Sequence, residues 1–116
     1  MQGYQLTFYT GENVRHAHVT LAEWLMELAK SLSLRGATML TATEGLGRDH
    51  RFHSAHFIEL ADQPVEVIMA VTAQEADLLF ERLSQEDVSL FYVKIPVEFG
   101  SVGLQSGKSL ASTGLG

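Results

Sequence analysis

Two threonine–glutamate pairs constrain the fold of this chain more than any other feature. Thr20 is followed three residues later by Glu23, and Thr72 by Glu75, and each pair precedes apolar residues at helical spacing. In this arrangement, a capping box, the two side chains bond the free N–H groups of a helix's first turn. The sequence therefore predicts two helices, which begin directly after Thr20 and Thr72.

Each predicted helix has one apolar stripe, which is typical of a helix that packs on a core. Gly36 follows the first stripe, and glycine often adopts the left-handed conformation that ends a helix, so we expect Gly36 to cap it. The second helix has an acidic side that continues into Glu86 and Asp87. The stripes consist of Leu21, Leu25, Leu28, Ala29 and Leu32 in the first helix and Ala76, Leu79, Phe80 and Leu83 in the second.

Four stretches with strand character flank these helices. They run over residues 4–10, 37–43, 65–71 and about 89–97. The resulting order, β-α-β-β-α-β, specifies an α+β ferredoxin-like sandwich, in which two helices cover one face of a four-stranded antiparallel sheet. A weaker strand candidate, residues 55–60, lies in the long connection between the second and third strands.

The second face of this predicted sheet has no cover. Residues 65–71 are apolar at both parities, which is typical of a strand buried on both faces. An open apolar face is unusual in a monomer of this size, so the sequence predicts a homo-oligomer that buries it. The residues expected on this face are Leu40, Ala42, Ile68, Ala70, Leu90 and Tyr92.

Composition and charge exclude several classes of function. Fourteen acidic and eight basic residues give a net charge of −6, which disfavours nucleic-acid binding because that needs a basic surface. The absence of cysteine removes disulfide frameworks, cysteine zinc sites and thiol catalysis. No apolar run approaches the roughly 18 residues of a membrane span, and Met1–Thr10 do not resemble a secretion signal. We therefore expect a cytoplasmic protein that does not insert into a membrane.

The chain divides into one domain, residues 1–99, and a tail rich in glycine and serine, residues 100–116. No Gly-x-Ser-x-Gly turn or other nucleophile–base pair is visible in the sequence. We therefore expect a binding protein rather than an enzyme.

The long connection, residues 48–63, carries a cluster of histidines at a spacing of three: His50, His53 and His56. Imidazole ligands suit zinc, copper or nickel, so a divalent-metal site is one hypothesis. On an extended chain His53 projects away from the other two, so the three cannot all bind one ion locally. His16 and His18 could add ligands, or a symmetry axis could gather one histidine from each subunit. The alternative interpretation is that these histidines have structural or surface roles and bind no metal.

Glycine and arginine at the start of the same connection point to a different ligand. Gly45 and Gly47 would let backbone N–H groups approach an anion closely, and Arg48 and Arg51 add positive charge. A turn or a bulge would explain the two glycines equally well. The candidate ligand-binding residues are Gly45, Gly47, Arg48, Arg51 and His53.

Several segments also carry a family resemblance. They are Tyr9–Asn13 with Arg15, Gly36–Met39, Glu44–Arg48, Phe52–Ala55, Leu60, Pro64–Val65 and Val67–Ile68. Together they resemble the PII-like family of small proteins classified as domain of unknown function 190, over about residues 4–98. More distantly, Gly45–Arg48 is similar to the Gly-Phe-Gly-Arg that opens the T-loop of PII signalling proteins.

The resemblance implies a homotrimer that binds an adenine nucleotide between subunits as its small-molecule effector. It also implies that residues 48–63 are the T-loop counterpart, which would contact a membrane transporter or an enzyme. Gly45, Gly47 and Arg48 would then contact the nucleotide. The chain departs from PII proteins between its second helix and last strand, where Ser84–Val88 is short and acidic rather than rich in glycine with a lysine.

Overall fold

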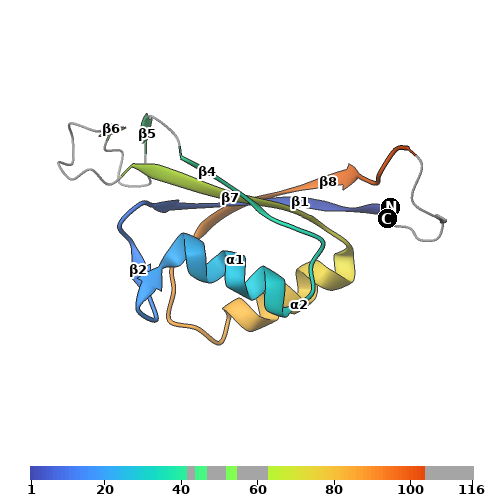
Figure 1. Ribbon diagram of the computed structural model, residues 1–116, viewed down its shortest axis with the longest axis horizontal. Coiled ribbons are helices and arrows are strands. Elements are labelled where there is room, and N and C mark those ends of the chain that lie inside the picture. Colours follow the sequence, from blue (N-terminus) through green and yellow to red (C-terminus); the bar gives the residue numbers. More distant parts are fainter. Residues whose placement is uncertain (42–43, 47–51, 55–62, 104–116) are drawn as a thin grey trace.

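The computed structural model describes residues 1–41, 44–46, 52–54 and 63–103. Its main sheet has four strands in the order β4-β7-β1-β8, and both helices lie on one side of it (Figure 1). The elements of these two layers are β1 (Gln2–Gly11), α1 (Leu21–Ser31), β4 (Thr38–Thr41), β7 (Pro64–Val71), α2 (Ala73–Leu83) and β8 (Phe91–Glu98). The predicted ferredoxin-like α+β sandwich is confirmed.

Two short hairpins complete the described structure. One consists of β2 (Arg15–His16) and β3 (Val19–Thr20), and the other of β5 (Glu44–Leu46) and β6 (Phe52–Ser54). The sequence did not predict either hairpin, because two- and three-residue strands are too short to show an alternating pattern. The strand predicted at residues 55–60 lies outside the described residues.

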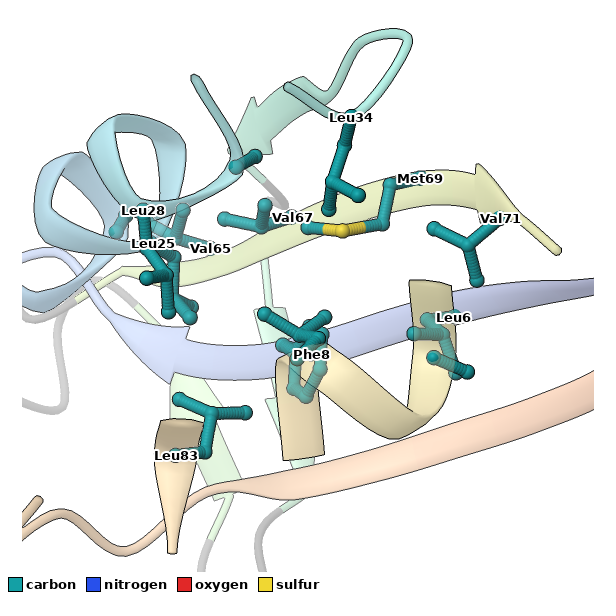
Figure 2. Packing of buried hydrophobic residues seen from close by; sticks show 14 residues of the cluster. Leu6, Phe8, Leu25, Leu28, Leu34, Val65, Val67, Met69, Val71 and Leu83 are labelled. Atoms are coloured by element: carbon teal, nitrogen blue, oxygen red, sulfur yellow. The ribbon is translucent and has the colours of Figure 1, made fainter. Parts of the chain in front are cut away.

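The strand pairing fixes which side chains face the helices. β1 pairs antiparallel with both β7 and β8, and β4 pairs with the other side of β7. Leu6 and Phe8 lie opposite Met69 and Val67, and all four are buried between the sheet and the helices (Figure 2). The residues between them in sequence project to the opposite face, since neighbours along a strand alternate.

Both predicted capping boxes are present. The Glu23 N–H donates to Thr20 Oγ1 at 3.1 Å, and the Thr20 N–H donates to the Glu23 carboxylate at 3.4 Å. Thr72 and Glu75 make the same pair of bonds at 3.2 and 2.9 Å. Each cap contributes about 1 kcal/mol to stability, and the two together set where α1 and α2 begin on the sheet.

The prediction that Gly36 caps α1 was wrong. The helix ends at Ser31, and Ser33 takes the left-handed conformation with φ of 58°. The Leu34 N–H then donates to the Ala29 carbonyl at 3.0 Å, which is the bond that closes a Schellman motif. Leu34 is buried in the core, and this apolar anchor explains why the helix ends five residues before the glycine.

The predicted open face needs a partial correction. Leu40, Ile68 and Ala70 lie on it, but Tyr92 does not, because Tyr92 pairs with Phe8 and its ring packs toward the helices against Phe80. Leu90 precedes β8 and packs against the core, and Ala42 lies outside the described residues. The side chains of β8 on the open face are instead Phe91, Val93, Ile95 and Val97.

Gly3 provides a test of the strand packing. A Cβ at this position would lie 2.0 Å from the Val71 carbonyl oxygen, which belongs to the backbone and cannot move aside cheaply. We expect Gly3→Ala to destabilise the domain by about 1–3 kcal/mol, as overpacked sites do. Gly100→Ala is the matched control, because a Cβ there meets nothing within 4 Å. Thermal unfolding of the two variants measures the difference, and equal melting temperatures would contradict this packing.

Candidate functional site

The sheet face opposite the helices, which we call the open face, carries large exposed apolar side chains. Phe91 is 50% exposed, Ile95 46% and Leu40 49%, and these residues come from the two edge strands. Between them, the Tyr9 ring lies 5.7 Å from the Phe91 ring. Thr7 is buried even in the single chain, so the centre of this face is already partly shielded from solvent. Such a surface is typical of an interface rather than of a solvated sheet.

Two of the candidate ligand-binding residues, Gly45 and His53, lie near the end of the sheet where the long connection leaves and returns. β4 ends there at Thr41, and β7 begins with Pro64, which pairs with Gly11 of β1. β5 and β6 lie beyond this end (Figure 1). Gly45 of β5 pairs with His53 of β6, so the structure brings two of the five candidates together as cross-strand neighbours. Gly47, Arg48 and Arg51 lie outside the described residues.

The metal hypothesis remains a prediction. His50 and His56 lie outside the described residues, so the histidine cluster of the long connection is not tested. Within the part of the chain that is described, no group of three or more metal-ligating side chains is present. His16, which was considered as an added ligand, has its Nε2 atom 2.9 Å from Glu86 Oε1.

His16 and Glu86 belong to a cluster that joins three elements, which we call the clasp. Glu86 follows α2 and also accepts a hydrogen bond from Arg82 in the last turn of that helix. The His16 ring lies edge-on to the Trp24 ring of α1, with 4.7 Å between centroids. The Arg82 guanidinium lies 5.9 Å from the centre of the same Trp24 ring. The clasp therefore fixes the β2–β3 hairpin to both helices.

The clasp changes the electrostatics of the acidic connection after α2. Arg82, and then His16, hydrogen-bond to the Glu86 carboxylate and hold its pKa below the ordinary value. Glu86 is thus a paired anion rather than a free charge on a solvated helix face. Asp87, the next residue, is exposed. The connection consequently presents less net negative charge than its sequence indicates.

Comparison with known proteins decides the family. The family model for DUF190, described as "Uncharacterized ACR, COG1993", matches residues 3–88. The chain belongs to the DUF190 family. A search of curated proteins gave no match.

Solved structures show that this DUF190 chain has a PII-like fold. They include structures of CPII, a nitrogen regulatory PII-like protein from Thiomonas intermedia K12. One, bound to ADP, AMP and bicarbonate, aligns with a TM-score of 0.55 and 17% identity over 84% of this chain and 89% of that one. A second structure, at 2.3 Å with the same ligands, aligns with a TM-score of 0.54 and 18% identity and covers 84% of this chain and 97% of that one. A third, bound to ADP and bicarbonate, aligns with a TM-score of 0.52 and 20% identity and covers 84% of this chain and 89% of that one.

Sequence reasoning missed the clasp of this DUF190 chain. Glu86 reads as one more acid on the solvated side of the second helix, and His16 lies 70 residues away from it. No local pattern links residues at that separation. The one signal in the sequence was that Arg82 is a single arginine among acidic residues, with Glu86 four residues after it. On a helix, residues at this spacing can form an ion pair.

Among the described residues, no helix has both the length and the apolar character needed to cross a membrane. Both helices of the sandwich are eleven residues long and have one polar side.

The lowered pKa of Glu86 predicts a pH dependence of stability. A carboxylate whose pKa is lowered in the folded state stabilises the fold at pH values above its ordinary pKa of 4.5. This stabilisation is lost as the pH falls through the folded-state pKa. We expect wild type to melt above Glu86→Gln at neutral pH, with the gap closing in acid. Asp77→Asn, an exposed change on α2, is the control. Thermal unfolding between pH 7 and pH 3 measures the gap, and a gap that does not change with pH would contradict this assignment.

Proposed function

We propose that this protein is a PII-like regulator: a homotrimer that binds an adenine nucleotide between subunits and presents residues 48–63 to a target protein. The observation that carries this proposal is the fold match to CPII, whose three structures are bound to ADP and bicarbonate, two of them also to AMP. Membership of the DUF190 family over residues 3–88 is consistent with it. The target would be a membrane transporter or an enzyme.

The open face supports self-association. Burying an exposed aromatic or branched side chain stabilises an interface by about 1.5–3 kcal/mol for each fully buried residue. The open face offers Tyr9, Phe91 and Ile95, which are all at least 37% exposed in the single chain. The helices occupy the other side of the sheet, so copies that meet through their open faces leave α1 and α2 outside (Figure 1).

The β5–β6 hairpin supports anion binding at the end of the sheet. Gly45 has no side chain that would keep a phosphate or a bicarbonate away from its backbone, and its partner across the hairpin is His53. Arg48 and Arg51 supply the positive charge in the same segment of sequence. In a chain of net charge −6, these two arginines give a small anion positive groups with which to pair.

The pairing of Glu86 also favours an anionic ligand. The sequence places Ser84–Val88 where PII proteins have a glycine-rich connection with a lysine, and free carboxylates there would repel a phosphate. Arg82 compensates the charge of Glu86, and His16 hydrogen-bonds to the same carboxylate. We propose binding rather than catalysis, so the nucleotide should be recovered chemically unchanged.

Nucleotide binding is testable by calorimetry. We expect ADP or AMP, with and without bicarbonate, to give a saturable heat signal with the full chain. Arg48→Ala should weaken the affinity by about 10- to 100-fold, as expected for loss of a charge-assisted hydrogen bond. Lys30→Ala removes the same charge from the exposed last turn of α1 and should leave the affinity unchanged. The absence of heat with every nucleotide would overturn the nucleotide part of the proposal.

Self-association is testable by one substitution on each side of the sheet. Ile95→Asp introduces a charge on the open face, where it would be buried between copies, and should reduce the mass in solution to that of one chain. Leu78→Asp changes a residue that is 56% exposed on α2 and should leave a trimer. Light scattering measures both masses. A trimeric Ile95→Asp variant would show that the open face is not the interface.

A further inference from the structure

The segment that joins β1 to α1 contacts two distant connections at once. At its start, the Glu12 N–H donates to the Gln63 carbonyl at 2.8 Å, directly before β7 begins. Further along, His16 of β2 contacts Glu86 in the connection after α2. We call residues 12–20 the bridge segment, because it spans from the entrance of β7 to the end of α2.

The tip of the bridge segment is conformationally strained. Ala17 and His18 have φ of 52° and 72°, the left-handed region that a two-residue hairpin of this kind requires. Glycine, asparagine and aspartate normally fill such turns, because a Cβ in this region lies too close to the next carbonyl. Arg15 bonds the His18 carbonyl at 2.7 Å, and this bond holds the turn from within. The hairpin therefore closes against its own backbone preference.

The clasp supplies the opposing stabilisation from outside the hairpin. The His16 side chain is only 18% exposed, with Trp24 on one side and the Glu86 carboxylate on another. Arg82 holds the same carboxylate in place. A strained turn that is held by one tertiary cluster is poised between a closed and an open arrangement, so a change at Glu86 shifts it.

We propose that the bridge segment is a conformational link, closed by Glu86, that couples the connection after α2 to the entrance of β7. When the clasp opens, the hairpin relaxes, and the bond from Glu12 to Gln63 at the other end of the segment weakens with it. The regulatory meaning of this link rests on the proposed function, since Gln63 ends the segment expected to contact the target. The coupling itself requires no ligand.

Amide hydrogen exchange on the full chain tests the link. Glu86→Gln removes the charge and keeps the size, and it should speed exchange at the Leu21 amide, which bonds Val14 at 2.8 Å, by about two- to fivefold. The Glu12 amide should accelerate by a similar factor. Asp87→Asn removes the neighbouring exposed charge and should change neither rate.

A second variant acts in the opposite direction. His18→Gly removes the Cβ from a left-handed position, so the closed hairpin becomes easier to hold. It should slow exchange at Leu21 and Glu12, and it should offset part of the acceleration when combined with Glu86→Gln. This opposite sign is not expected from a variant that merely disturbs the surface.

Three outcomes would overturn the inference. If Leu21 accelerates in Glu86→Gln while Glu12 does not, the bridge segment does not reach β7. If neither rate changes, Glu86 does not close the hairpin. If Leu21 and Glu12 exchange no faster than the buried amides of β1 and β7 in the unchanged protein, they open only when the whole domain unfolds, and no link exists. All rates are measured without nucleotide, so a failed ADP titration would overturn the proposed function and leave this result standing.

Discussion

The structure depends on a sheet that is covered on one face only. The register of β1 against β7 and β8 sends Leu6 and Phe8 toward the helices and sends Tyr9 the other way. α1 and α2, which begin at their capping boxes, cover the face that carries Leu6 and Phe8. In a single chain the open face remains exposed to solvent. A PII-like sandwich of this kind is stable through its core, but it presents an apolar surface that a second copy can bury. The self-association proposed above rests on that asymmetry.

Much of the fold could be predicted because its determinants are local. A capping box needs residues three apart, and the stripe of α2 from Ala76 to Leu83 repeats within one helix. The order of helices and strands then leaves few ways to form one sheet, and the ferredoxin-like arrangement is the one observed. The family resemblance rested on short segments spread along the chain, and a match over residues 3–88 confirms it.

What could not be predicted depends on partners far apart in sequence. Phe91 and Tyr92 are adjacent aromatic residues, so alternation alone cannot decide which one faces the helices; the pairing of Tyr92 with Phe8 decides it. The end of α1 depends on Leu34 finding the core, which outweighs the preference for glycine at the cap. In the candidate site, only the pairing of Gly45 with His53 is placed by the described residues. The contact of Glu86 with His16 has no local signal, yet it joins the β2–β3 hairpin to the connection after α2.

The central claim, that the open face is buried between copies, is tested most directly by two tyrosines on opposite faces of the sheet. In a single chain Tyr9 is 37% exposed on the open face and Tyr92 is 45% exposed on the helix side, so the two should react alike with hydroxyl radicals. Footprinting of the intact protein by mass spectrometry compares them within one sample. We expect Tyr9 to be protected and Tyr92 to be labelled. Equal labelling of the two would contradict the account.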